Sequence, residues 1–290
     1  MPSLRDVRRR IRGIRSTAQI TKAMELVAAS RMRRAQQRVV AARPYAETMR
    51  TLISELAGAA GGGGAQGLHP LLVQRPVDTV GIVLITTDRG LCGALNTNTI
   101  RRGSELILEQ SQAIQLLTIG RKGQDFMSRR GHRILATVTG MGARPGYDAV
   151  IPIARNIMES YNSGVMDVCY IVYPHFVSTL SQRPTVLQLL PIQASERIEK
   201  PLEYIFEPDP GTILEQLLPR YVEVVLYEAI LEMAASEQSA RMVAMRNANQ
   251  NAKDLINDLT LVYNKVRQAN ITREVIEVAS AAEFMASQNR

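Results

Sequence analysis

The sequence predicts an α/β protein in which the two ends of the chain form a long antiparallel coiled coil. Near both termini, apolar residues recur at alternating spacings of three and four, which places one narrow apolar stripe on each of two helices. Between these regions, short β-branched runs alternate with helix-like stretches. We therefore expect the N- and C-terminal helices to form a rod, with an α/β domain inserted between them.

The first helix is expected to run from Ser3, a suitable N-cap, to Leu56. Pro44 lies inside it and should bend the helix or mark a joint. The helix defines a domain of residues 1–57, and a Gly-rich connector follows over residues 58–76. Its apolar stripe, here called the first seam, comprises Leu4, Val7, Ile11, Ile14, Ala18, Thr21, Glu25, Ala28, Met32, Ala35, Val39, Ala42, Ala46, Met49, Ile53 and Leu56.

The middle of the chain, residues 77–194, is expected to form a Rossmann-like α/β domain. Strands are expected at Thr79–Thr86, Ala113–Ile119, His132–Thr139, Asp167–Tyr173 and Pro184–Pro191. Helices are expected around Ala94–Gln110, Lys122–Arg130 and Asp148–Tyr161. This alternation predicts a mostly parallel sheet with helices on its faces. Only a short polar turn separates the last two strands, so that pair should be antiparallel.

A connector or foot, residues 195–210, precedes the C-terminal helix domain of residues 211–290, which should be helical from Gly211 to Ser287. Because the α/β domain is a single insertion, antiparallel packing is simplest, and the longer C-terminal helix should project beyond its partner. Its stripe, the second seam, comprises Ile213, Leu217, Arg220, Val224, Tyr227, Leu231, Ala234, Gln238, Arg241, Met245, Ala248, Ala252, Leu255, Leu259, Val262, Val266 and Ala269.

The irregular positions of the seams carry further information. The first seam is polar only at Thr21 and Glu25, and Arg241 interrupts the second. We interpret these positions as places where the coil meets a surrounding partner. A different face of the first helix, near the polar positions, carries Ile20, Met24 and Val27.

The C-terminal tip is apolar on nearly all sides, which is unfavourable for a lone helix in water. We expect the tip to lie inside a sleeve made by another protein; the alternative is a tip that folds back on its own domain. The apolar residues are Val275, Ile276, Val278, Ala279, Ala281, Ala282, Phe284 and Met285.

Positive charge is concentrated in the first helix. Residues 1–50 contain thirteen Lys or Arg and three acidic residues, and every basic residue lies off the seam. A face of one sign suggests an acidic partner surface or nucleic acid. Binding of nucleic acid remains an alternative, although Tyr45 is the only aromatic residue of the first helix and the aromatic interleaving that usually accompanies such binding is absent from it.

The sequence contains no firm catalytic or metal-binding motif, and we expect no cofactor and no metal. The nearest candidate is Thr87–Asn96, directly after the first strand, where Gly90 and Gly93 could approach a phosphate at a helix N-terminus. A structural turn is the favoured interpretation, and a small-molecule enzyme using this turn is the weaker alternative. Cys92 and Cys169 should be reduced and buried.

Three long segments resemble the gamma subunit of rotary, F-type ATP synthases. They are Arg9–Gln36, Thr87–Asn96 and Ala235–Glu274, in the order that the family has. The resemblance implies that the two terminal helices form a central rotor shaft, with the tip inside a hexamer of alternating alpha and beta subunits. Proton or sodium flow through the membrane rotor ring (c-ring) would turn the shaft, and ATP would be made or hydrolysed at the beta subunits. This chain would be non-catalytic.

The resemblance also implies contact positions. Met24 matches the family's coupling-sensitive methionine beside the beta-subunit contact. The residues that match contacts of the C-terminal helix with the hexamer or the opposite helix are Arg241, Gln268, Thr272 and Glu274. Those matching the foot that meets the rotor ring and the epsilon subunit are Tyr204 and Glu207. The protein would be peripheral, on the cytoplasmic face of a bacterial plasma membrane, with no direct membrane insertion and no nucleic-acid partner.

Overall fold

The computed structural model describes residues 3–59, 69–142, 144–193 and 209–288. The chain divides into two compact units, which we call unit 1 (residues 1–27 with 244–290) and unit 2 (residues 28–243). Each unit contains one part of the N-terminal helix and one part of the C-terminal helix. Within the described ranges, no helix has both the length and the apolar character needed to cross a bilayer.

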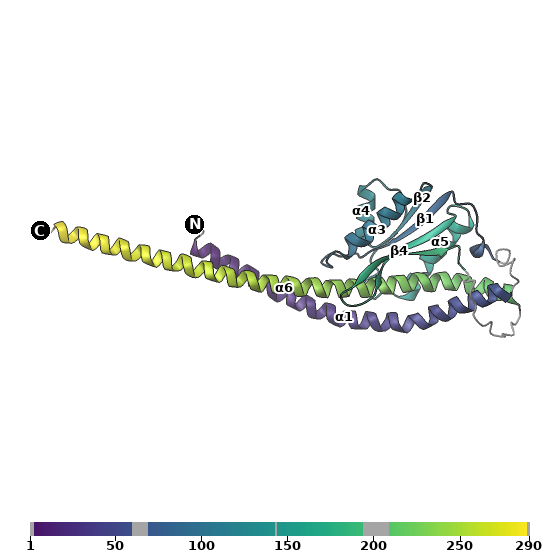
Figure 1. The fold of residues 1–290 in the computed structure, drawn as a ribbon, viewed down its shortest axis with the longest axis horizontal. Coiled ribbons are helices and arrows are strands. Elements are labelled where there is room, and N and C mark those ends of the chain that lie inside the picture. The colour runs from purple at the N-terminus through teal and green to yellow at the C-terminus, as the bar shows by residue number, and fades with distance from the viewer. Residues whose placement is uncertain (1–2, 60–68, 143, 194–208, 289–290) are drawn as a thin grey trace. The chain divides into compact units, whose positions relative to one another are not determined.

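Unit 2 is built around a five-stranded sheet (Figure 1). Its strands are β1 (Thr79–Ile85), β2 (Ala113–Ile119), β3 (Ile134–Val138), β4 (Val168–Phe176) and β5 (Gln182–Leu190). The spatial order is β3-β2-β1-β4-β5, in which the first four strands are parallel and β5 pairs antiparallel to β4. The predicted mostly parallel sheet with one antiparallel strand is thus confirmed.

Helices cover both faces of this sheet. On one face, α3 (Leu95–Glu109) and α4 (Arg121–Arg129) pack against side chains of β1 and its neighbours. On the other face lie α5 (Ile151–Asn162) and the long helices. Two short 3-10 helices, η1 (Pro70–Leu72) and η2 (Tyr147–Ala149), complete the unit. Because β1 is covered on both faces, it is an almost continuous apolar run and not an alternating one.

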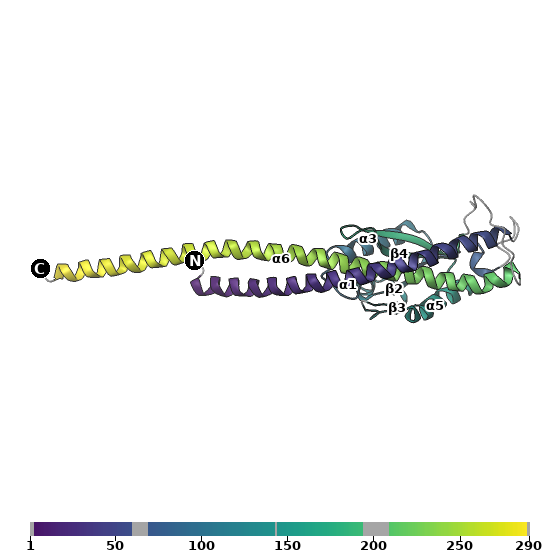
Figure 2. The same cartoon turned by 90° about the horizontal axis from the view of Figure 1, so that it is seen from below.

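The long helices are α1 (Leu4–Ala59) and α6 (Pro210–Gln288). The Ser3 side chain accepts a hydrogen bond from the backbone N–H of Asp6, as expected of an N-cap. Helix α1 continues through Pro44 without an interruption, so of the two expected effects of this proline, a bend or a joint, the break in the helix is not present. In both units the two helices run antiparallel and side by side (Figures 1 and 2).

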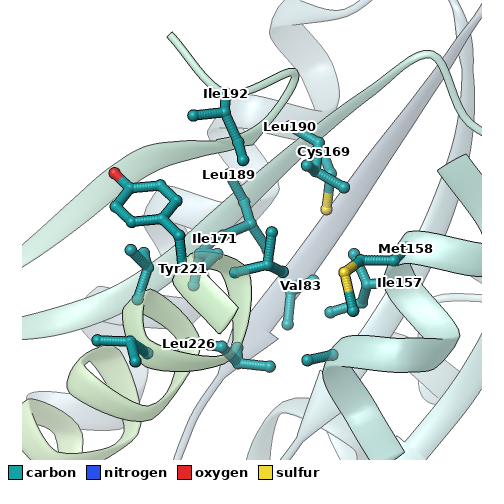
Figure 3. Close-up of a cluster of buried hydrophobic side chains, with 14 of the residues drawn as sticks. Val83, Ile157, Met158, Cys169, Ile171, Leu189, Leu190, Ile192, Tyr221 and Leu226 are labelled. Carbon is teal, nitrogen blue, oxygen red and sulfur yellow. The ribbon is translucent and has the colours of Figure 1, made fainter. Parts of the chain in front are cut away.

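The core of unit 2 joins the sheet to both long helices. Figure 3 shows side chains from β1, α5, β4, β5 and α6 meeting in one cluster. Between residues 221 and 239, α6 is buried on nearly all sides because it lies between the sheet and α1. Val222, Val225 and Leu226 are therefore buried although they lie off the second seam.

The first seam is confirmed as the face of α1 that packs against α6. Every seam residue is buried or half-buried, including the polar Thr21 and Glu25. This agreement reflects a narrow contact, because α1 packs mainly against one other helix and a heptad pattern describes such a contact well.

The second seam is only partly correct in its last part, within unit 1, where Leu259 and Val266 are half-buried as predicted but other positions are not. Leu255 and Val262 were expected to face α1, but both are exposed, whereas Ile256 and Tyr263 are half-buried. The contacts explain the shift by one residue. The Arg8 guanidinium donates a hydrogen bond to the Tyr263 hydroxyl (3.1 Å) and lies over the Tyr263 ring, which turns this face of α6 toward α1.

Candidate functional site

A buried polar layer crosses the helix pair of unit 1. Glu25 accepts hydrogen bonds from Lys22 Nζ (3.0 Å) and from Arg246 Nε on α6 (3.2 Å). The Asn249 side-chain amide donates to the backbone carbonyl of Ala18 at 2.7 Å, and the Thr21 hydroxyl donates to the same carbonyl. The polar seam positions Thr21 and Glu25 are thus satisfied by the chain itself and face α6. The interpretation that they meet an outside partner is wrong.

This layer should fix the register of the two helices. A buried polar pair tolerates only the register in which its partners meet, whereas alanine-rich seam positions tolerate several. The hydrogen bond from Lys22 and the hydrogen bond and charge of Arg246 hold the pKa of Glu25 below its ordinary value of 4.5. Glu25 is therefore ionised at neutral pH.

Replacing Glu25 by glutamine should remove an acid-sensitive part of unit 1 stability. The lowered pKa means that ionised Glu25 stabilises the helix pair above about pH 4.5 and loses this effect as pH falls through the folded-state pKa. Because Lys22 and Arg246 are largely exposed, the contribution should be only about 0.5–1 kcal/mol. Hydrogen exchange of the α1 amides at pH 7 and pH 3 measures it.

In that experiment, the local opening free energy of the unmodified chain should fall toward acid pH, and that of the Glu25→Gln variant should not. Glu277→Gln, at an exposed position of α6, is the matched control and should behave like the unmodified chain. An identical pH dependence for Glu25→Gln and the unmodified chain would contradict the assignment.

The outer surface of unit 1 carries exposed apolar side chains. On α1, Ile20 and Val27 are exposed and Met24, one turn from each, is half-buried. On α6, Leu255 and Val262 are exposed in the same unit. The predicted second apolar face around Met24 is confirmed as a surface feature. Apolar groups of this kind on a paired helix point to contact with another protein.

The tip of α6 extends past the N-terminal end of α1 within unit 1 (Figures 1 and 2). All described side chains from residue 271 to residue 282 are exposed, so this stretch does not fold back on the chain. Gln268, Thr272 and Glu274 are exposed here and are available to a partner. Their predicted contacts with the hexamer stay a prediction. Tyr204 and Glu207 lie outside the described residues.

The turn after β1 is held together by its own side chains. The Asn96 amide donates to the Thr87 hydroxyl (2.8 Å), and the Asn96 side-chain oxygen accepts from the Thr87 backbone N–H (3.1 Å). The Asp88 carboxylate accepts the backbone N–H groups of Arg121 (3.1 Å) and Gly140 (2.9 Å). These bonds join the turn to the start of α4 and to the end of β3. They favour the interpretation of this segment as a structural turn.

Arg241 lies in unit 2 and faces this turn. Its guanidinium donates to the Gly90 carbonyl (3.1 Å) and to the Glu237 carboxylate (2.6 Å). Cys92 in the same turn and Cys169 in β4 are both buried and free, as predicted. The structure therefore joins two segments that the resemblance linked only through the family, Thr87–Asn96 and Ala235–Glu274.

A charged cluster and a hollow lie where α1 and α6 pair in unit 2. Glu232 of α6 accepts a hydrogen bond from Arg43 of α1 (3.3 Å) and interacts with the His175 ring of β4.

An open hollow of about 390 Å³ is lined by Ala42, Tyr45, Tyr147, Arg220, Val224 and Tyr227. Tyrosine and arginine are enriched where proteins meet, so this hollow is a second candidate contact surface.

Two residues of the site were not singled out from the sequence, namely Arg246 and Asn249. The signal that could have identified them was the buried carboxylate of Glu25. A charged residue on an apolar seam requires a partner on the facing helix, and the only way to find that partner was to know the register.

The comparisons with known proteins cover almost the whole chain. The family model described as ATP synthase matches residues 3–285. The ATP synthase gamma chain of Roseiflexus castenholzii is 49% identical over 291 residues, covering 99% of both chains. That of Pelotomaculum thermopropionicum is 46% identical over 284 residues, covering 97% of this chain and 99% of the relative.

Solved structures agree with this fold. A chain of the Euglena gracilis mitochondrial ATP synthase (OSCP/F1/c-ring, rotational state 3) has a TM-score of 0.72 at 21% identity, covering 99% of this chain and 96% of that one. A chain of the Tetrahymena thermophila mitochondrial ATP synthase (central stalk/c-ring) has a TM-score of 0.58 at 25% identity, covering 79% and 99%. With the family model and the relatives, these findings show that the chain belongs to the ATP synthase gamma chain family.

Proposed function

We propose that this chain is the central rotor shaft of a proton-translocating ATP synthase and is itself non-catalytic. It would couple ion-driven rotation to conformational change at the catalytic beta subunits. The observation that carries this proposal is the surface of unit 1, an antiparallel helix pair with exposed apolar rows and a strongly basic α1. Membership of the gamma chain family favours this function over the nucleic-acid alternative.

The apolar surface suits a shaft that turns inside a sleeve of alternating alpha and beta subunits. Contacts through Ile20, Val27, Leu255 and Val262 are non-directional, so they do not favour one rotational position strongly. Met24 lies on this surface. Gln268, Thr272 and Glu274 lie farther along α6 and would contact the hexamer near the tip.

The basic face of α1 would meet acidic segments of the beta subunits in turn. Most of its arginines are exposed, and few of them have an acidic partner among the residues that the structure describes. Attraction between exposed charges steers association and distinguishes one partner state from another, and salt weakens it.

Unit 2 would carry the turning force between the rotor ring and the shaft. Its sheet packs directly against α6, and Glu232 links α6 to α1 and β4, so the three elements should move together. We place the contact with the c-ring and the epsilon subunit at Tyr204 and Glu207. The similar chain from the Tetrahymena thermophila ATP synthase belongs to a central stalk with a c-ring, which supports the ring as a partner.

We place the assembly on the cytoplasmic face of a bacterial plasma membrane, with this chain as a peripheral subunit. The chain would reach the membrane through the rotor ring and not by inserting a helix. In this assembly, proton passage would occur in the ring and ATP chemistry in the beta subunits. The chain itself would transmit the rotation.

Co-expression with alpha and beta subunits tests the proposal. We expect a complex that co-purifies at low salt and weakens as salt rises, because the basic face loses its attraction. The double variant Arg12→Glu/Arg15→Glu should weaken the complex and reduce its salt dependence. Arg129→Glu/Arg133→Glu, at exposed positions of unit 2, is the matched control for net charge. Failure of the unmodified chain to bind the subunits at any salt concentration would overturn the proposal.

A further inference from the structure

A cluster of charged side chains joins the sheet of unit 2 to both long helices. Its centre is the Glu232 carboxylate of α6, whose side chain is 3% exposed. Arg43 donates a hydrogen bond to one oxygen of this carboxylate at 3.3 Å, and the His175 ring contacts the other oxygen. We call the whole group the junction cluster; it comprises Arg43, Glu47 and Arg50 of α1, Glu228 and Glu232 of α6, and His175 of β4.

The charges of the junction cluster balance only when one more positive charge is present. Its three carboxylates face two guanidinium groups, so with a neutral His175 ring the cluster carries one excess negative charge. Protonation of His175 removes this excess beside the buried Glu232, because the ring contacts that carboxylate directly. Histidine is the side chain that ordinarily gains and loses its charge between about pH 5 and 8.

Glu228 shows the same shortage of positive charge. Burial and the charge of Glu232 raise the pKa of Glu228 above its ordinary value of 4.5, and Arg50 and Arg43 oppose this effect only in part. Ionised Glu228 therefore costs stability; the cost is absent below about pH 4.5 and grows as pH rises through the folded-state pKa. Proton uptake by His175 and by Glu228 thus acts in the same direction, toward a tighter cluster at lower pH.

The remaining groups that face His175 do not change this direction. On the same strand, the Tyr173 ring lies edge-on to the His175 ring, and burial together with Glu232 raises the pKa of Tyr173, so that ring is neutral. On β5, Arg183 pairs with His175 in the sheet but is exposed, so water screens its charge. The His175 side chain is 37% exposed, so a proton can reach it from the solvent.

We propose that the junction cluster is a proton-sensitive latch, in which uptake of one proton on His175 tightens the joint between β4, α6 and α1. When His175 loses this proton, Arg43 is the only cation bonded to Glu232 among the described residues, and the joint loosens. The latch is a property of the chain and does not depend on the proposed rotor function. In a rotor, it would make the stiffness between the sheet and the shaft depend on pH.

Hydrogen exchange of the isolated full-length chain tests the latch. After correction for intrinsic exchange, the α6 amides around Glu232 should open about fivefold more often at about pH 8 than at about pH 5.5. The partial exposure of His175 and Arg43 limits the effect to this size. Amides of α3, on the opposite face of the sheet, should show little difference. His175→Gln should lose most of the pH dependence around Glu232, because glutamine does not take up a proton.

Two further variants separate the latch from a general loss of stability. His175→Lys carries its charge at both pH values, so at about pH 8 it should open as rarely as the unmodified chain does at about pH 5.5. His132→Gln, at a half-buried position before β3, is the matched control and should keep the full pH dependence. If His175→Gln does not fold, His175→Lys decides the question alone.

Three results would overturn the proposal. They are a pH dependence in His175→Gln equal to that of the unmodified chain, an opening of His175→Lys at about pH 8 as frequent as that of the unmodified chain, and a loss of the pH dependence in His132→Gln. Each of them would show that proton uptake on His175 does not control the joint.

Discussion

Replacing Gly120 by alanine should lower the free energy of unfolding by more than about 3 kcal/mol. Gly120 lies between β2 and α4 with φ +94 and ψ 141, a region that is open to almost no residue except glycine. A Cβ atom there would lie 2.1 Å from the carbonyl oxygen of Thr86, which is backbone and cannot rotate away. The clash falls where the buried Thr86 hydroxyl accepts the backbone N–H of Gly123 at 2.8 Å.

Gly131→Ala is the matched control for this prediction. Gly131 also has a positive φ (+80), but a Cβ atom there meets nothing within 4 Å. Gly131→Ala should lower the free energy of unfolding by only about 1–2 kcal/mol, which is the strain of the backbone conformation alone. Urea unfolding of both variants, followed by circular dichroism, gives the comparison. Equal losses would show that the contact with Thr86 is unimportant.

Replacing Met24 by lysine should uncouple rotation from ATP synthesis. Met24 is half-buried beside the exposed Ile20 and Val27, on the surface that we place against the hexamer. A charge there must either stay unpaired against apolar groups or bind a carboxylate of one beta subunit, and both outcomes favour some rotational positions over others. A preference of about 1.4 kcal/mol for some rotational positions changes the rate of rotation about tenfold. We therefore expect the amount of ATP made per proton to fall by about tenfold.

Reconstituted vesicles with a proton gradient provide the measurement. ATP hydrolysis should be less affected than ATP yield, because the beta subunits are unchanged. Gln19→Lys, which places the same charge on an exposed position of the same helix, is the control for net charge, and Met24→Leu is the control for shape. An unchanged yield of ATP per proton in Met24→Lys would refute the proposed role of this position.

The resemblance of the sequence to a known family was sufficient for the family, and apolar spacing along the chain was sufficient for much of the fold. The strands of unit 2 were found because buried parallel strands are short, apolar and β-branched, and β2 was predicted with its observed bounds, Ala113–Ile119. The first seam was found because α1 presents one narrow stripe to one partner. The exposed apolar face around Met24 followed from the same periodicity.

The roles of the polar residues were harder to predict, because a polar side chain on a seam has two opposite explanations. Thr21 and Glu25 were assigned to an outside partner, but both are buried, and Glu25 accepts a hydrogen bond from Arg246 of α6. Arg241 was recognised as an interruption, but its neighbour Gly90 lies far away in the sequence and meets it only through the fold. No local pattern distinguishes a polar residue that faces out from one that is satisfied within.

The amino-acid sequence by itself determined which segments are helix or strand and which face of α1 is buried. These properties depend on spacing along the chain. The tertiary structure decided the register of α6 against α1, where Ile256 and Tyr263 face inward in place of Leu255 and Val262. Both rows have heptad spacing and similar apolar area, so the hydrophobic effect alone does not separate them. Directional hydrogen bonds, such as the one from the Asn249 amide to the Ala18 carbonyl, separate the two registers because they form in only one of them.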